Sequence, residues 1–75
     1  MKIGDLIQCN APSVSRILLY DIESFNMLSK HDSSAIGIIL EKTVVASTTQ
    51  QIQYIKILIE GSVGWTVPEV LRVIK

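Results

Sequence analysis

Cysteine, aromatic residues and net charge are all scarce in this sequence. A single cysteine, Cys9, cannot form a disulfide within the chain, so a disulfide-stapled fold is excluded and nothing points to an oxidising compartment. Seven Lys and Arg residues balance seven Asp and Glu residues, and the formal net charge is zero. Binding to phosphate backbones or to anionic membranes depends on an excess of Lys and Arg, so both functions are disfavoured.

Long hydrophobic runs are also missing. The longest apolar stretch, residues 35–40, is far shorter than the roughly 20 residues of a transmembrane helix. A signal peptide is not indicated, because Asp5, Gln8 and Asn10 interrupt the amino-terminal segment. We therefore expect residues 1–75 to form one domain that is neither secreted nor inserted in a membrane. A 48% share of hydrophobic residues against 19% charged residues excludes a disordered chain.

The hydrophobic residues that are present are mostly β-branched. Twelve Ile and seven Val accompany seven Leu, which favours sheet over helix. Turn residues divide the chain into five expected strands, at residues 1–8, 35–45, 52–60, 63–67 and 72–74. In the first strand, we expect Ile3, Leu6 and Ile7 to be buried.

Alternation assigns the side chains of the two longest strands to faces. In 52–60, one face is predicted to carry Ile55, Ile57 and Ile59, and the other Tyr54, Lys56 and Leu58. In 35–45, one parity carries Ile36, Ile38, Leu40 and Val44, and the other carries Glu41 and Thr43.

Glycine and proline define the carboxyl-terminal third of the chain. Gly61 accepts positive φ, which predicts a tight hairpin turn between 52–60 and 63–67. Gly64 allows this hairpin to approach a neighbouring strand closely. Pro68 cannot donate to a strand ladder, so the strand ends there and one helical or 3₁₀ turn precedes the last strand.

Residues 9–34 are consistent with more than one structure. Residues 10–13 have turn chemistry, and the apolar run 14–20 fits either a strand or a helix. Asp21 is able to cap a short helix, which would carry Ile22, Phe25 and Leu28 on one side. Residues 29–34 are polar and predict a loop.

Several short motifs together resemble a known family. They are Lys2-Ile3-Gly4-Asp5-Leu6-Ile7, Gly37-Ile38-Ile39-Leu40-Glu41, Ile55-Lys56-Ile57-Leu58 continuing to Gly61 and Gly64-Trp65, and Val70-Leu71-Arg72-Val73-Ile74. The chain resembles the small Src-homology-3-like barrel proteins of tailed bacteriophages, particularly cyanophages. The resemblance implies an all-β, five-stranded antiparallel barrel with a long first loop and a 3₁₀ turn before the last strand. It also implies a viral protein that resides in the host cytoplasm or in the virion.

Catalytic, metal and cofactor chemistry find no support in the sequence. His31-Asp32 is the only His beside a carboxylate, and we interpret it as part of the polar loop. Cys9 is interpreted as a small buried hydrophobic residue, because no Lys, Arg or His is near it in sequence. The acidic residues are dispersed and fit no metal-ligand spacing. We therefore predict no enzymatic activity, cofactor, metal or small-molecule substrate.

A surplus of apolar residues points instead to protein contact. Both parities of 36–40 and of 55–59 are largely apolar, and 17–19 adds a third such run, whereas a small barrel has only one interior. We predict a structural or interaction module that contacts a virion or host protein, with a homo-oligomer also open. The expected contact residues are Tyr54, Trp65, Ile17, Leu18, Leu19 and Tyr20. The alternative is a nucleic-acid-binding barrel, with Lys42, Lys56 and Arg72 beside the two aromatics, although the balanced charge disfavours it.

Overall fold

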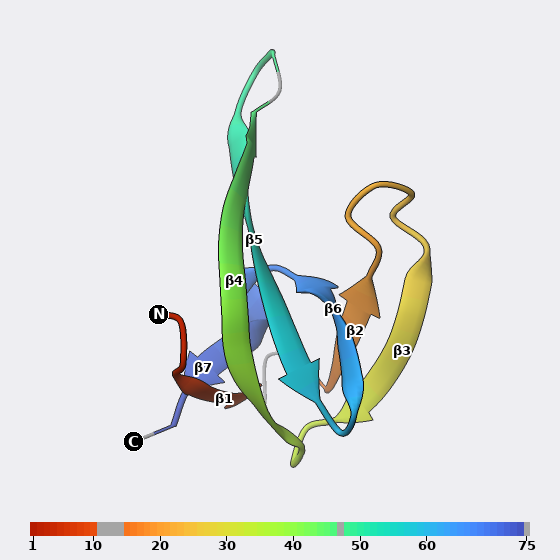
Figure 1. Cartoon of the computed structure of the whole chain (residues 1–75), viewed down its shortest axis with the longest axis vertical. Coiled ribbons are helices and arrows are strands. Elements are labelled where there is room, and N and C mark those ends of the chain that lie inside the picture. Colours follow the sequence, from red (N-terminus) through yellow and green to blue (C-terminus); the bar gives the residue numbers. More distant parts are fainter. Residues whose placement is uncertain (11–14, 47, 75) are drawn as a thin grey trace.

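The chain folds into a single antiparallel β-sheet (Figure 1). The computed structural model describes residues 1–10, 15–46 and 48–74. In these ranges the elements are β1 (Leu6–Cys9), β2 (Arg16–Tyr20), β3 (Met27–Asp32), β4 (Ile36–Ala46), β5 (Gln51–Ile59), β6 (Ser62–Thr66), the 3₁₀ helix η1 (Pro68–Val70) and β7 (Leu71–Val73). The strand order across the sheet is β3-β2-β6-β5-β4-β1-β7. The prediction of an all-β, antiparallel fold is confirmed.

The number of strands and the closure of the sheet differ from the five-stranded barrel expected. The described residues contain seven strands, and β3 and β7 lie at the two ends of the strand order without pairing with each other. The two additional strands, β2 and β3, form a hairpin inside the segment expected to be a long first loop. Residues 29–32 belong to β3, so the predicted polar loop is reduced to a turn at 33–34. The turn expected at residues 10–13 falls mainly outside the described residues.

The segment after β2 is a turn and not the short helix that Asp21 was able to cap. The Asp21 carboxylate accepts a hydrogen bond from the backbone N–H of Glu23 at 2.8 Å, and the N–H of Phe25 donates to the Asp21 carbonyl at 2.7 Å. Asp21 N–H in turn donates to the carbonyl of Asn26 at 3.0 Å. The Asp21 side chain therefore accepts a backbone hydrogen bond, as a helix cap would, but the segment that it stabilises is the turn of the β2–β3 hairpin.

The hydrophobic core lies on one face of the sheet. Its fully or nearly buried members are Ile7, Cys9, Ile17, Leu19, Ile39, Ile55, Ile57, Ile59 and Leu71. The predicted division of β5 into two faces is confirmed, with Ile55, Ile57 and Ile59 on the buried face, and so is the burial of Cys9. Ile3 and Leu6 are exposed, contrary to expectation. Ile3 lies in a turn closed by an Asp5 N–H to Lys2 carbonyl bond of 3.0 Å, before β1 begins. Leu6 is in β1, where alternation turns it to the face opposite Ile7 and Cys9.

A bulge in β4 changes which residues share a face. Ile39 pairs with Ile57 and Glu41 pairs with Lys56, so Leu40 is the extra residue. Because side chains alternate with period two, this insertion moves Val44 to the face opposite Ile36. The prediction that both lie on one face is therefore wrong.

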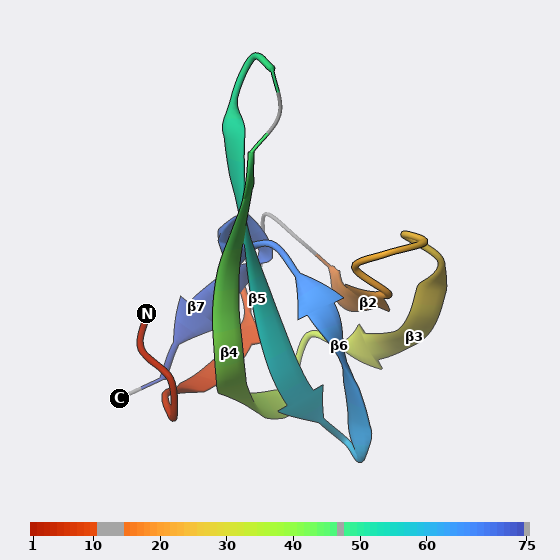
Figure 2. The same cartoon turned by 45° about the horizontal axis from the view of Figure 1, so that its top comes forward.

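Beyond the bulge, β4 and β5 continue as a two-stranded arm that projects from the rest of the sheet (Figures 1 and 2). The pairs of the arm run to Ala46 opposite Gln51. β1 pairs with β4 only over 36–38, and β6 pairs with β5 only over 55–59. The outer part of the arm is therefore held by its own ladder.

The β5–β6 hairpin and the closing segment form as predicted. Glu60 and Gly61 have φ of 49° and 78°, the pair of positive values of a two-residue turn that follows the twist of the strands. β6 ends before Pro68, which opens η1, and β7 then pairs with β1.

Candidate functional site

All four aromatic side chains of the chain line one groove on the sheet face opposite the core. The groove has a volume of about 380 Å³. Its aromatic residues are Tyr20, Phe25, Tyr54 and Trp65, and its other lining residues are Arg16, Leu18, Asp21, Ile22, Thr66, Val67 and Val70. Four aromatics in 75 residues are few, so their convergence on one concavity makes it the leading candidate site.

Strand pairing places the aromatic rings of the groove. In the sheet, Trp65 of β6 lies between Tyr20 of β2 and Lys56 of β5. The Lys56 ammonium lies 5.9 Å from the centroid of the Trp65 ring, close enough for a cation–π interaction. Tyr54 precedes Lys56 by two residues on β5, so alternation puts both side chains on the same face of the sheet. These positions require β2 to lie against β6, and the sequence alone does not reveal that pairing.

Phe25 is held over the groove at a conformational cost. Its φ of 57° lies in the left-handed region, where a bulky residue is uncommon. The side chain is 54% exposed, and its ring centroid lies 6.0 Å from that of Tyr54 at an interplanar angle of 51°. A strained backbone that keeps an aromatic ring exposed is typical of a binding site and not of a residue retained for core packing.

The predicted contact residues are divided between the groove and the core. Tyr54, Trp65, Leu18 and Tyr20 are brought together in the lining. Ile17 and Leu19 are 0% exposed, so neither is available to a partner, and their proposed contact role is corrected. The reason is the alternation of β2, which turns every second residue of the run inward. Phe25 was not among the predicted contacts, because the sequence indicated Asp21 as a helix cap and not as the turn that presents Phe25.

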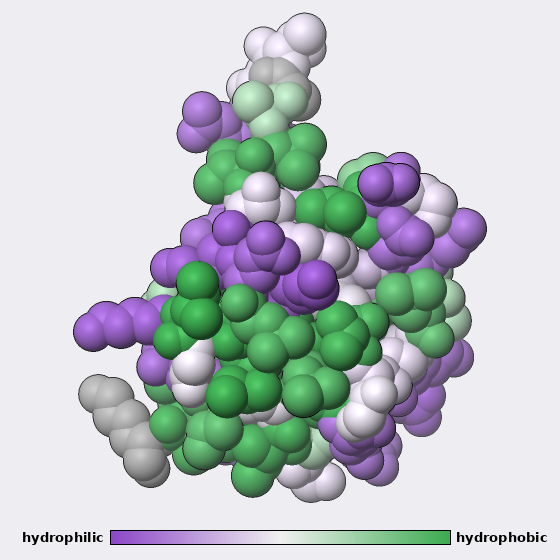
Figure 3. Space-filling view, in the orientation of Figure 1, coloured by the Kyte–Doolittle hydropathy of each residue, from purple (hydrophilic) through white to green (hydrophobic). Residues whose placement is uncertain are grey.

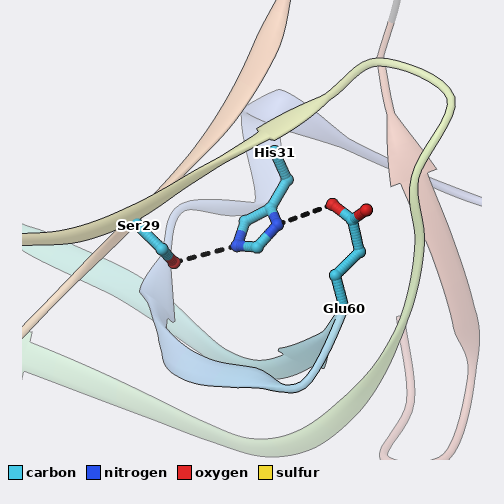
Figure 4. A network of polar contacts seen from close by, with 3 residues as sticks. All are labelled: Ser29, His31 and Glu60. Carbon is cyan, nitrogen blue, oxygen red and sulfur yellow. Dashed lines mark hydrogen bonds and ion pairs between the residues drawn. The ribbon is translucent and has the colours of Figure 1, made fainter.

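A second polar cluster surrounds His31 (Figure 4). His31 Nδ1 lies 2.8 Å from Glu60 Oε1, and Nε2 lies 2.8 Å from Ser29 Oγ. A carboxylate oxygen accepts, so Nδ1 donates to Glu60, and the other ring nitrogen shares a hydrogen bond with the Ser29 hydroxyl. His31 is only 6% exposed, so its interpretation as part of a solvated loop is wrong.

The hydrogen bonds connect Ser29, His31 and Glu60 in the way that a hydrolase triad connects its serine, histidine and carboxylate. The residues around this cluster nevertheless favour a structural role. A nucleophile must open onto a cleft where substrate binds. The hollow beside His31 is lined by Arg16, Lys30, His31, Asp32 and Glu60, and Ser29 is not among these described residues. The cluster instead connects β3 to the β5–β6 turn, two segments that are distant in sequence.

We expect His31→Ala to lower the free energy of unfolding by about 1–3 kcal/mol, because it removes two hydrogen bonds and leaves a void. Glu60→Gln is the control, since its amide oxygen still accepts from Nδ1, and we expect a smaller loss. Urea denaturation of the two variants and the parent measures the difference. Equal midpoints for His31→Ala and the parent would show that the cluster contributes nothing to stability.

Comparison with protein-family models, with curated proteins and with solved structures found no match to this chain. The resemblance to phage barrels therefore remains a prediction. Among the described residues, no helix is long and apolar enough to cross a membrane. In the same ranges, no three His, Cys, Asp or Glu side chains gather as metal ligands would.

Proposed function

We propose that the chain is a non-catalytic protein-interaction module that binds an extended segment of a partner protein in the aromatic groove. The observation that carries the proposal is the convergence of Tyr20, Phe25, Tyr54 and Trp65 from separate parts of the chain on one hollow. Aromatic residues are enriched among the side chains that dominate protein interfaces, and they supply large contact areas at low conformational cost.

The chemistry of the groove indicates the kind of segment it accepts. Two charged side chains, Arg16 and Asp21, stand among its described lining residues, and the rest of the lining is apolar or aromatic apart from Thr66. Such a surface favours a partner segment with apolar or aromatic side chains and few charges. A second Trp and an Asn-Tyr pair after Pro68, which proline-binding Src-homology-3 domains use, are missing, so a proline-rich ligand is not the preferred one.

The order of the strands and the 3₁₀ helix along the chain supports a proposal about the origin of the protein. The order of a first strand, three consecutive strands β4, β5 and β6, and a 3₁₀ turn before the last strand is the part of the arrangement implied by the phage resemblance that supports this proposal. On this basis we propose a phage-encoded, Src-homology-3-like protein whose first loop is folded into the β2–β3 hairpin. Its partner is then a protein of the virion or of the infected host.

A peptide selection tests the groove directly. A library of displayed random decapeptides is selected on the immobilised chain, and the enriched peptides are titrated against it in solution. Trp65 is the only Trp of the chain, so its emission reports occupancy of the groove. We expect Tyr54→Ala to weaken binding at least tenfold, as for residues at the centre of an interface. Val44→Ala, on the arm and outside the groove lining, is the control and is expected to bind like the parent.

Two results contradict the proposal. One is a selection that enriches no peptide over the unselected library. The other is a set of enriched peptides that bind Tyr54→Ala as tightly as the parent, which would place their site elsewhere on the surface.

Nucleic-acid binding is the alternative, and we expect little salt-sensitive affinity for DNA or RNA. Lys42 donates to the Met1 carbonyl at 2.8 Å, Arg72 donates to Gln8 Oε1 at 2.9 Å on β1, and Lys56 lies beside Trp65, so the three cations are engaged at separate places. Each phosphate contact adds roughly 0.7–0.9 to the slope of log affinity against log salt. Anisotropy titrations of labelled single- and double-stranded oligonucleotides at 50 and 200 mM salt measure that slope. Sub-micromolar binding with a steep slope would favour the alternative.

A further inference from the structure

A row of aliphatic residues crosses four strands on the outer face of the sheet. Strand pairing places Leu6 opposite Ile38, Ile38 opposite Leu58, and Leu58 opposite Val63. We name these four residues the aliphatic row. Ile36 lies beside it on β4, two residues before Ile38. In Figure 3 apolar side chains cover much of the lower part of this face of the molecule.

Three of the four strands under the aliphatic row, β1, β4 and β5, are apolar on both faces where the row crosses them. Ile7, Ile39, Ile57 and Ile59 point from these strands into the core. An antiparallel sheet with one solvated face normally shows apolar and polar residues in alternation, whereas strands covered on both faces show continuous apolar runs. At the row, the outer face of these three strands therefore has the composition of a covered face, although none of the described elements covers it.

From this mismatch we infer that the aliphatic row is the centre of a symmetric interface with a second copy of this chain. Three of its residues, Leu6, Leu58 and Val63, are 39–49% exposed, and the adjacent Ile36 is 55% exposed. Together with Ile38 they form one contiguous apolar patch on the order of a few hundred Å², the size at which an exposed patch on a monomer is often functional. Polar neighbours such as Gln8 and Arg72 extend the contact towards the ~800 Å² per partner of a standard interface.

A second copy fits the chemistry of the row better than an unrelated partner. The row contains no charged or hydrogen-bonding side chain that would select a different surface, and the chain has no net charge to oppose self-association. Two sheet faces pack at about 10 Å with their strands nearly aligned, which suits a row of aliphatic side chains on a sheet. An identical patch is always available for a two-fold contact.

We place the two-fold axis of this interface along the strands. It passes the centre of the row, between Ile38 and Leu58, and so puts Leu6 of one copy over Val63 of the other. Within one copy these two residues are three strands apart, or roughly 14 Å at the usual strand spacing. The geometry therefore predicts that residues 6 and 63 are neighbours only between copies.

Light scattering and sedimentation of the purified chain over about 10–200 μM measure self-association. We expect the parent to approach twice the mass of one chain and Ile38→Thr/Leu58→Thr to have the mass of one chain. Val44→Thr, which removes similar apolar surface on the arm, is the control and is expected to remain dimeric. A parent that stays monomeric over this range, or a threonine variant that stays dimeric, would overturn the inference. Circular dichroism checks that the variant keeps its strands.

Thiol cross-linking tests the two-fold arrangement without perturbing the centre of the row. A thiol-reactive cross-linker shorter than the ~14 Å between residues 6 and 63 of one copy is expected to join Leu6→Cys/Val63→Cys into covalent dimers, whereas Cα atoms that face each other at ~10 Å are too far apart for a direct disulfide. The single variant Leu6→Cys is expected to cross-link far less, and Cys9 is 0% exposed. Equal cross-linking by the single and double variants, or none by either, would refute the proposed axis.

The aliphatic row and the aromatic groove adjoin on the outer face of the sheet and share no residue. Lys56, which contacts the Trp65 ring of the groove, lies two residues from Leu58 of the row. Loss of dimerisation in the threonine variant with peptide binding unchanged would support the inference independently of the proposed function.

Discussion

Replacing Ile57 with alanine is expected to remove about 2–5 kcal/mol from the free energy of unfolding. Ile57 is 0% exposed, and it lies opposite Ile39 on one side and Gly64 on the other. Truncation at this central position leaves a void bounded by the rigid ladders of β4 and β6, which limits collapse of the neighbours. Native proteins have a free energy of unfolding of only ~5–15 kcal/mol, so we expect Ile57→Ala to unfold at a clearly lower temperature than the parent.

Leu28→Ala is the matched control for Ile57→Ala. It removes a side chain of the same size that is 55% exposed on β3, so we expect a much smaller loss. Chemical denaturation followed by far-ultraviolet circular dichroism compares the two variants with the parent. Similar midpoints for both variants would contradict the assignment of Ile57 to the centre of the core.

The carboxyl-terminal half of the fold was predictable because its signals are local. The run 52–60 is rich in β-branched residues and places Ile55, Ile57 and Ile59 at alternate positions. Gly61 permits positive φ, and Pro68 stops the strand. Each of these features depends on two or three adjacent residues. The order β5, β6, η1, β7 follows directly from them.

The β2–β3 hairpin could not be predicted in the same way. β3 combines Met27 and Leu28 with four polar residues, and it lies at the end of the sheet, where alternation is weak because one edge faces solvent. The side chain of Asp21 suits a helix cap and a turn equally well. Only pairing with a distant strand distinguishes the two, and the described ladder between β2 and β6 consists of Tyr20 opposite Trp65.

The candidate site was accessible to sequence reasoning only in part. The apolar surplus correctly indicated exposed hydrophobic residues, and Leu6, Leu58 and Val63 now show where some of them lie. The convergence of the aromatics depends on β2 reaching β6, and the position of the outer face of β4 depends on a bulge at Leu40. Neither long-range pairing nor a one-residue insertion leaves a periodic signal.

Gly64→Ala is expected to separate the β2–β3 hairpin from β6 or to cost about 1–3 kcal/mol by overpacking. A Cβ atom at position 64 would lie 2.8 Å from the Cβ of Leu19. Rotation of the Leu19 side chain cannot relieve this contact, because its own Cβ is fixed to the backbone, so β2 must move. Tyr20 and Phe25 are carried by the hairpin and lie in the groove lining. The substitution is therefore expected to weaken peptide binding as well as stability.

Gly61→Asn in the same β5–β6 hairpin separates this steric effect from a general sensitivity to glycine replacement. No atom lies within 4 Å of a Cβ built at position 61, and its φ of 78° is one that asparagine tolerates better than other side chains. We expect Gly61→Asn to keep both peptide binding and most of the stability. Hydrogen exchange followed by NMR then locates the damage in Gly64→Ala: the amides of β2 and β3 should lose protection before those of β4 and β5. Uniform loss of protection over all strands would show that the hairpin is not a separable unit, and unchanged stability and binding would refute the close packing of β2 on β6.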